Sequence, residues 1–305
     1  MELHNDIEVF TELINATSDF YGIDVALIEK DYYVSCLLRY IKERINGIVF
    51  KGGTSLSKCY KIIDRFSEDV DLTLNNDNFT QSKKRKANKE LVSICDELSL
   101  KILNREFVNS HSHSNYNAYR IEYPKLFNDD KYKNEITVEM VFIQKSYPNI
   151  EKEVTSYISE YLNKIKRTDL LCKYQLIPFQ IAVQTLERTL IDKVFALCDY
   201  YIRGEQRRNS RHIYDIAKLL PKVDLFSESF KSLVLNVRSD RRKIKKCVAA
   251  QDGIEINEVL KRIINSDFYK NDYIESTEKL LIKPLPYPKA INSLDVIISS
   301  NAFDL

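Results

Sequence analysis

The hydrophobic pattern along the chain predicts strands and helices in the N-terminal half. Apolar residues recur at helical spacing over 7–19 and 24–44, and the apolar run GIVF at 47–50 predicts a short buried strand. Residues 54–63 predict a helix that follows a Gly-Gly turn. Residues 69–74 alternate between polar and apolar side chains, as in a half-buried strand. The predicted order is therefore strand, loop, helix, strand.

Later segments extend this mixed pattern and then become helical. A long helix is predicted over 84–104, and strands are expected near 105–110, 117–123 and 135–143. A helix is expected near 151–166, and one more strand near 179–184. Six further helices are predicted at 185–203, 211–220, 227–237, 254–265, 269–282 and 288–299. The chain is thus predicted to have an α+β fold. Its expected regions are N-terminal helices (1–45) packed on the core, an α/β core (46–183) and a C-terminal helical domain (184–305).

Composition narrows the class of protein. Of 305 residues, 44% are hydrophobic and 30% charged, and no apolar run approaches the ~18 residues that a membrane span needs. The N-terminal stretch MELHNDIEVF carries acids and lacks the pattern of a secretory signal. Six cysteines are scattered without CxxC spacing, which is typical of thiols in a reducing compartment. We therefore expect a cytoplasmic protein with no membrane partner.

Basic residues are clustered although the net charge is only +2. Local runs occupy 83–86, 203–211 and 238–246. A single basic run is explained by the solvent-exposed face of a helix. Three runs in a chain that also has a candidate phosphate loop would instead fit an anionic substrate. The sequence leaves both interpretations open.

The stretch KGGTSLSKCYKIIDRFSEDVDLTL at 51–74 contains the strongest candidate chemistry. Gly52 and Gly53 would let backbone N–H groups approach an anion closely. Asp69 and Asp71 would share one face of the predicted strand, about 7 Å apart at Cα. Two carboxylates on one face repel each other unless a cation lies between them. Mg²⁺, with Mn²⁺ as an alternative, suits such oxygen ligands and usually arrives with substrate phosphates.

A third carboxylate is expected on a neighbouring strand. Glu139 lies in the alternating segment ITVEMVF, and Glu135 shares its face. The sequence does not decide between these two acids, and an outward-facing Glu139 on a one-sided sheet is the simpler alternative. If this strand neighbours the one with Asp69 and Asp71, three carboxylates converge. Such a site holds divalent ions for in-line phosphoryl or nucleotidyl transfer.

Two helices of the C-terminal half carry further candidates. Lys193 borders the apolar stripe of its helix, where it either extends its ammonium group into water or faces an anion. Arg211 and Asp215 are spaced as an exposed i,i+4 pair, and a phosphate-facing patch is the alternative. The Walker pattern is absent from the sequence, because Lys58 follows the glycines too late.

A strand, Gly-Gly-Thr-Ser, a helix and a strand with Asp-Val-Asp together resemble the signature of DNA polymerase beta-like nucleotidyltransferases. More narrowly, five segments resemble, in order, the motifs of the AbiEii/AbiGii toxin family of type IV toxin–antitoxin and phage-abortive systems. These segments are EKDYYVSCLL (29–38), FKGGTSLSKCY (50–60), RFSEDVDLTL (65–74), ERTLIDKVFAL (187–197) and NSRHIYDIAKLL (209–220).

The resemblance implies a bilobal protein, in which a nucleotidyltransferase sheet and a helical lobe enclose a nucleoside triphosphate. It implies that Asp69 and Asp71 bind Mg²⁺, that Lys193 contacts phosphates and that Asp215 completes the site. Glu139 is predicted as the third metal ligand from its strand position alone. The resemblance also implies that Gly53, Thr54 and Ser55 hold the triphosphate. The full predicted nucleotide-binding set is Gly52, Gly53, Thr54, Ser55, Lys58, Ser67 and Arg211. The chain departs from the family pattern at His212, where the family often has an acid.

The leading hypothesis is a Mg²⁺-dependent nucleotidyltransferase toxin. It would move a nucleoside monophosphate from a triphosphate onto an acceptor hydroxyl, at the 3′ end of tRNA among family relatives. Growth arrest or abortive phage infection would follow, and a cognate antitoxin would restrain the protein. The alternatives are transfer to a small molecule and a nucleotide-binding regulator without turnover.

Overall fold

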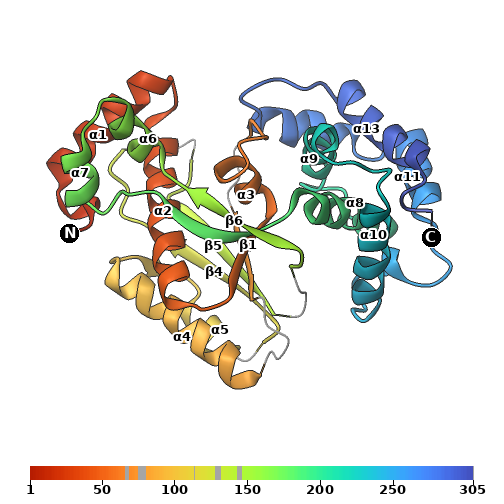
Figure 1. Ribbon diagram of the computed structural model, residues 1–305, viewed down its shortest axis with the longest axis horizontal. Helices are drawn as coiled ribbons and strands as arrows, with labels where there is room; N and C mark the ends of the chain where they lie inside the picture. The colour runs from red at the N-terminus through yellow and green to blue at the C-terminus, as the bar shows by residue number, and fades with distance from the viewer. Residues whose placement is uncertain (66–68, 75–79, 113, 128–131, 143–145, 305) are drawn as a thin grey trace. The chain divides into compact units, whose positions relative to one another are not determined.

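A computed structural model describes residues 1–65, 69–74, 80–112, 114–127, 132–142 and 146–304 (Figure 1). Within these residues seven strands form one mixed sheet in the order β3-β4-β5-β2-β1-β7-β6. The predicted α+β class is therefore confirmed. The strands are β1 Ile48–Lys51, β2 Asp69–Leu74, β3 Lys101–Ile102, β4 Tyr116–Glu122, β5 Glu135–Val141, β6 Asn149–Val154 and β7 Phe179–Gln184.

The chain divides into two compact units. The first comprises Met1–Tyr60 and Glu68–Val183, and the second comprises Lys61–Ser67 and Gln184–Leu305. The first unit contains the sheet together with α1 Ile7–Tyr21, α2 Val25–Arg44, α3 Gly52–Lys58, α4 Gln81–Glu97, α5 Arg105–Ser110, α6 Tyr157–Lys164 and α7 Thr168–Lys173.

One face of the sheet is apolar and buried. Val70 and Leu72 of β2 and Val138 of β5 are fully buried. They belong to the same core as side chains of α2 and α4, which lie against each other. Since side chains alternate along a strand, the polar residues between these positions all lie on the opposite face. Burial of one face therefore fixes which side of the sheet carries Asp69 and Asp71.

The order of the central strands decides which polar residues become neighbours. Strand β1 runs antiparallel to β2, and β2 runs parallel to β5. Strand β4 pairs with β5 in antiparallel register, and β7 joins β1 at the Phe50–Val183 pair. Segments 48–51, 69–74 and 135–141, which are far apart in the sequence, thus lie side by side.

The second unit is helical, and its helices are grouped together in Figure 1. They are α8 Leu186–Ile202, α9 Arg211–Leu219, α10 Glu228–Arg242, α11 Ile256–Asn265, α12 Lys270–Asp272 and α13 Tyr287–Ser300. Helix α9 packs against both α8 and α13. Helices α8 and α10 each have a side-chain N-cap. The Thr185 hydroxyl accepts a hydrogen bond from Arg188 N–H, and the Ser227 hydroxyl accepts one from Phe230 N–H.

A short excursion of the chain belongs to this helical unit. The Tyr214 hydroxyl accepts from Asp64 N–H at 2.9 Å, and the Asp64 carbonyl accepts from Ile282 N–H at 2.8 Å. Arg65 forms an isolated antiparallel bridge with Leu281. These contacts attach Asp64 and Arg65 to α9 and to the residues Leu281 and Ile282, which come at least 150 positions later in the sequence.

Several predicted elements are wrong in type or extent. The strand expected near 105–110 is helix α5, and the short strand β3 precedes it at Lys101–Ile102. The helix expected over 84–104 ends at Glu97, since Ser99 adopts a left-handed conformation with φ of 56° and turns the chain. The helix expected over 54–63 ends at Lys58.

Other differences concern short elements. Strand β6 and helix α7 were not predicted, and the helix expected over 151–166 begins only at Tyr157 because β6 occupies its first residues. The helix expected over 269–282 is divided into α12, a π-helix Tyr273–Thr277 and a 3₁₀ turn Glu278–Leu280. None of the helices in the described ranges combines the length and the apolar character needed to cross a bilayer.

Candidate active site

Strand register brings acidic residues of β2 and β5 together on the open face of the sheet. Asp71 pairs with Lys51 of β1 on one side and with Glu139 of β5 on the other. Directly paired residues point to the same face with Cβ atoms about 4.5–5.5 Å apart. Asp69 lies on this face two residues before Asp71. We call Asp69, Asp71 and Glu139 the acidic cluster.

The electrostatics of Glu139 show how closely these carboxylates approach. Burial and the negative charge of Asp71 raise the pKa of Glu139 to about 6, and Asp69 adds to the rise. A hydrogen bond from Tyr116 and the charge of Lys51 act in the opposite direction. The pKa of Tyr116 is itself raised, by burial and then by the charge of Glu139. The acidic cluster therefore contains unfavourable repulsion that a bound cation would relieve.

The glycine turn lies directly against one of these carboxylates. Gly52 has φ of 77°, a left-handed conformation that favours glycine, and a Cβ atom built there would lie 1.8 Å from Asp71 Oδ2. The Thr54 hydroxyl donates to the Asp69 carbonyl and so attaches α3 to β2. Asp71 thus lies beside the turn that the sequence singled out as a phosphate loop.

Glu135 and Glu139 have different surroundings. The Arg120 guanidinium donates two hydrogen bonds to Glu135, at 2.7 and 2.8 Å. This pair lowers the pKa of Glu135, whereas Glu139 faces Asp71 across the β2–β5 pair. Between the two acids that the sequence left open, the structure therefore places Glu139 in the acidic cluster.

Other predicted nucleotide ligands already have partners in the protein. The buried Ser55 hydroxyl donates to the Gly52 carbonyl at 2.8 Å, and the buried Lys58 pairs with Asp31 and donates to the Thr155 carbonyl. Ser67 lies outside the described residues. The nucleotide-binding roles of Gly52, Gly53, Thr54, Ser55, Lys58, Ser67 and Arg211 stay predictions.

Asp215 is at the centre of a second charged cluster, which lies within the helical unit. Its fully buried carboxylate accepts two hydrogen bonds from Arg65, at 2.7 and 2.8 Å, and forms an ion pair with Lys193 Nζ at 2.8 Å. Burial would raise the pKa of Asp215, but the charges of Arg65 and Lys193 outweigh it and hold the pKa well below its ordinary value. We call these three residues the Asp215 cluster.

This cluster corrects two interpretations. Asp215 does not form an exposed helical pair with Arg211, because its side chain is completely buried and is engaged by Arg65 and Lys193. Lys193 does not extend into water either, since only 12% of its side chain is exposed. Arg211 is the first residue of α9, one turn before Asp215.

Comparison with known families decides the assignment. The family model described as nucleotidyl transferase AbiEii toxin, type IV TA system, matches residues 38–292. The chain belongs to the AbiEii toxin family. A search among curated proteins finds no match. Membership confirms the predicted resemblance and supports a nucleotidyltransferase toxin that has a nucleotide substrate and an antitoxin partner.

In this AbiEii chain, the acidic cluster has the donor chemistry that Mg²⁺ prefers, namely carboxylate oxygens on a rigid sheet. In the part of the chain that the structure describes, however, no three acidic, histidine or cysteine side chains already converge as a metal site. Cation binding would therefore require these carboxylates to turn toward a common point. The role of Asp69, Asp71 and Glu139 as metal ligands accordingly belongs to the proposal below.

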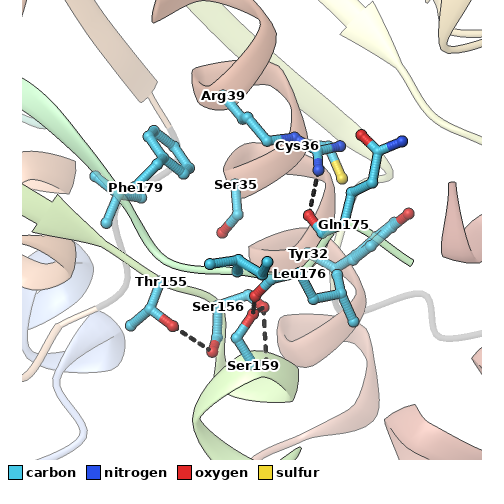
Figure 2. Close-up of a pocket in the computed structure, with 12 residues that line it drawn as sticks. Tyr32, Ser35, Cys36, Arg39, Thr155, Ser156, Ser159, Gln175, Leu176 and Phe179 are labelled. Atoms are coloured by element: carbon cyan, nitrogen blue, oxygen red, sulfur yellow. Dashed lines mark hydrogen bonds between the residues drawn. The ribbon is translucent and has the colours of Figure 1, made fainter. Parts of the chain in front are cut away.

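The AbiEii chain also has a small cavity, which is separate from the acidic cluster. Figure 2 shows its lining, which comes from α2 and from the segments at 154–159 and 175–179. Its volume of about 20 Å³ accommodates a water molecule rather than a nucleotide. Its Ser159 hydroxyl donates to the Leu176 carbonyl. The cavity is therefore no candidate for the substrate site.

Sequence reasoning missed three residues next to the predicted site residues. Arg65 was not singled out, because its contact with Asp215 spans 150 positions along the chain. Lys51 precedes the glycines immediately, which could have drawn attention to it. Tyr116 carries no sequence signal, since only the β4–β5 pairing brings its hydroxyl to Glu139.

Proposed function

We propose that this AbiEii-family protein is a Mg²⁺-dependent nucleotidyltransferase that moves a nucleoside monophosphate from a nucleoside triphosphate onto an RNA hydroxyl, the 3′ end of tRNA. Mn²⁺ is the alternative cation. The observation that carries the proposal is the contact between the Asp71 carboxylate and Gly52, with Glu139 in register beside it. Anion-binding backbone and cation-binding carboxylates are thereby adjacent.

Residues of the first unit would have distinct tasks. The backbone of Gly52 and Gly53, which has no side chain in the way, would approach the triphosphate. Asp69, Asp71 and Glu139 would hold the cation and, through it, fix the substrate position. A cation held there neutralises charge on the leaving pyrophosphate and lowers the pKa of the attacking hydroxyl. Pyrophosphate leaves as the new phosphodiester forms.

The Asp215 cluster supports a phosphate-binding role for Lys193. Arg65 and Lys193 both contact the single buried carboxylate of Asp215. The Lys193 ammonium group is therefore held in a fixed orientation, with Nζ 2.8 Å from Asp215 Oδ2. We propose that Lys193 contacts a substrate phosphate and that Asp215 orients Lys193.

In the cell, nucleotide addition to tRNA would block translation and arrest growth, and abortive infection would follow in phage-infected cells. The family assignment supports a cognate antitoxin that restrains this activity. Expression of the protein without an antitoxin should therefore stop growth.

The test is substitution of the acidic cluster with a matched control on the same sheet face. Asp69→Asn and Asp71→Asn should each reduce pyrophosphate release more than about 100-fold, since even outer-shell partners of metal ligands are worth about 10- to 100-fold. Glu135→Gln removes a carboxylate that is already paired with Arg120 and should leave turnover nearly unchanged. Labelled triphosphates supplied one at a time with total RNA identify the nucleotide and the acceptor.

Three outcomes would contradict this proposal. Growth arrest that persists in Asp71→Asn would exclude the carboxylates from catalysis. Pyrophosphate release without label in RNA would indicate a small-molecule acceptor. Triphosphate binding without pyrophosphate release, with any acceptor, would indicate a regulator.

A further inference from the structure

Two basic segments of the helical unit, 43 residues apart in the sequence, meet at the surface. The Arg203 guanidinium at the end of α8 donates to the Lys246 carbonyl at 2.8 Å. Arg203 also pairs with Glu205, whose pKa is lowered first by this pair and further by the charge of Lys246. The loops around 203–208 and 243–247 therefore form one surface. We call its basic residues the basic face: Arg203, Arg207, Arg208, Lys245 and Lys246.

Neighbouring arginines of the run 238–246 have structural roles instead. Arg238 is buried and donates to the carbonyls of the loop after α10, including Ile254 at 2.6 Å. Arg241 is buried and pairs with Asp192 and Asp199, at 3.2 and 2.8 Å. The run 238–246 therefore includes two arginines, Arg238 and Arg241, whose contacts within the protein stabilise the fold.

Four cations of the basic face have no such structural role. Arg207, Arg208, Lys245 and Lys246 are exposed. Within the ranges that the structure describes, none of these four side chains forms an ion pair with a carboxylate. The nearby Glu205 is already paired with Arg203. Their positive charge is thus available to a ligand outside the protein.

The backbone at Arg208 is held in a left-handed conformation. Arg208 has φ of 63°, a left-handed conformation that costs free energy for any residue with a Cβ. The buried Asp272 carboxylate holds this conformation by accepting from Arg208 N–H at 2.8 Å and from Ser210 N–H at 3.1 Å. These contacts fix the backbone from which the exposed Arg208 side chain extends.

The basic face continues toward the helix that carries Asp215. The Arg203 guanidinium lies 5.0 Å from the centre of the Tyr200 ring, and this ring stacks on His212 at 5.6 Å and 11°. Burial and the neighbouring cations Lys193 and Arg211 lower the pKa of His212 well below its ordinary value. His212 is therefore neutral at pH 7, and it adds no positive charge to the basic face.

We propose that the basic face binds the phosphate backbone of the acceptor RNA. Arginine forks and lysine ammonium groups contact phosphate oxygens without reading bases, so the face would position the RNA rather than select its sequence. This inference rests on the proposed function in one respect, namely that the acceptor is an RNA.

The test compares two variants that remove the same charge from different surfaces. One is Arg207→Gln/Arg208→Gln/Lys245→Gln/Lys246→Gln on the basic face. The control is Lys83→Gln/Arg85→Gln/Lys86→Gln/Lys89→Gln on the exposed side of α4. The probes are bulk tRNA and a fluorescent single-stranded RNA oligonucleotide, and affinity is measured between about 50 and 200 mM salt. Thermal unfolding measures whether both variants fold.

The basic-face variant should bind RNA about 10- to 100-fold more weakly at low salt. Its dependence of log affinity on log salt should flatten by about 0.7–0.9 for each phosphate that the variant no longer neutralises. The α4 variant should bind as the wild type does. Wild-type affinity and salt dependence in the basic-face variant would overturn the inference. So would binding of polyglutamate in place of RNA, which would indicate an acidic protein partner.

Arg208→Gly gives a second, independent measurement. It removes the charge and the strain together, so it should weaken RNA binding while raising the melting temperature. A rise in melting temperature with unchanged RNA binding would exclude Arg208 from the RNA-binding surface.

These measurements separate the inference from the proposed function. RNA binding requires no turnover, so the difference between the variants is measurable even in the Asp71→Asn background. Nucleotide transfer to RNA by the wild type and equally by the basic-face variant would overturn the inference alone. A binding difference without any pyrophosphate release would preserve the basic face as an RNA-binding surface and overturn the proposed function.

Discussion

At the scale of single residues, Gly52 and Asp71 explain why the glycine turn and the Asp-x-Asp strand lie so close together in the sequence. The Asp71 carboxylate occupies the space that a Cβ atom of residue 52 would fill. Each of the two residues therefore restricts the other. A side chain at position 52 cannot be accommodated without moving a carboxylate of the acidic cluster.

We expect Gly52→Ala to abolish nucleotide transfer and to destabilise the protein by more than the backbone cost alone. A left-handed φ costs about 1 kcal/mol for a non-glycine residue, and displacement of Asp71 adds to this. The matched control is Gly22→Ala, because Gly22 has φ of 65° and no atom within 4 Å of the added Cβ. Thermal unfolding and pyrophosphate release measure both effects. Equal losses in the two variants would mean that Asp71 is not displaced.

Glu139 makes the stability of the cation-free protein depend on pH. Its pKa is raised from 4.5 to about 6 in the folded protein. The folded state thus binds a proton more readily than the unfolded state, which favours folding below about pH 4.5 and is lost as pH rises through 6. A shift of this size corresponds to about 2 kcal/mol.

Glu139→Gln should therefore stabilise the cation-free protein by up to about 2 kcal/mol at pH 8, and the difference should vanish below about pH 4.5. Urea unfolding at a series of pH values measures it. Glu135→Gln is the control with the opposite sign, because Arg120 lowers the pKa of Glu135. Mg²⁺ should stabilise the wild type more than Glu139→Gln at pH 8. Equal stability of wild type and variant at pH 8 would show that the carboxylates do not repel.

At the scale of elements, α3 is anchored at its far end by a buried ion pair. Lys58, its last residue, contacts Asp31 of α2 and the Thr155 carbonyl. Asp31 also accepts from Tyr157 N–H at 2.9 Å. Three segments of the first unit thus converge on the end of the helix whose beginning is the glycine turn. This geometry gives Lys58 a part in positioning α3, and its predicted role as a nucleotide ligand stays a prediction.

We expect Lys58→Met and Asp31→Asn each to destabilise the protein by roughly 3 kcal/mol, as is typical when one partner of a buried pair is removed. The double variant should lose less than the sum of the two. Denaturant unfolding measures these free energies, and steady-state kinetics measures KM for the triphosphate. A raised KM in Lys58→Met with unchanged stability, and no effect of Asp31→Asn, would restore the nucleotide-binding role.

The long amphipathic elements were predictable from the sequence, whereas short ones were not. The pattern gave β2 at its observed bounds and α2, α8 and α9 within a residue or two. Strand β3 has two residues and α5 six, too few to show a period. Strand β6 carries NIEKEV, a polar edge strand without alternation.

The candidate site was predictable where its residues are close in the sequence. Gly52 and Asp71 lie on consecutive elements, so strand periodicity sufficed to aim the carboxylates. The choice of Glu139 over Glu135 required the β2–β5 register, which no local pattern determines. The pairing of Arg65 with Asp215 required knowledge of tertiary contacts.

At the scale of the whole molecule, the chain enters the helical unit twice. It first contributes Lys61–Ser67, returns to the sheet with β2, and enters again at Gln184. In this segment, Asp64 and Arg65 bind α9, and Asp64 also binds Ile282. The helical unit is therefore incomplete without a segment encoded between α3 and β2.

This connectivity sets a limit on dissecting the protein. A single cut at the 183/184 junction would leave Arg65 on the fragment with the sheet and Asp215 on the other. The isolated helical fragment would then keep a buried carboxylate with Lys193 as its remaining cationic partner among the three residues of the cluster. To express the helical unit alone, one would have to join residues 61–67 to 184–305, because the two segments of this unit are not contiguous in the sequence.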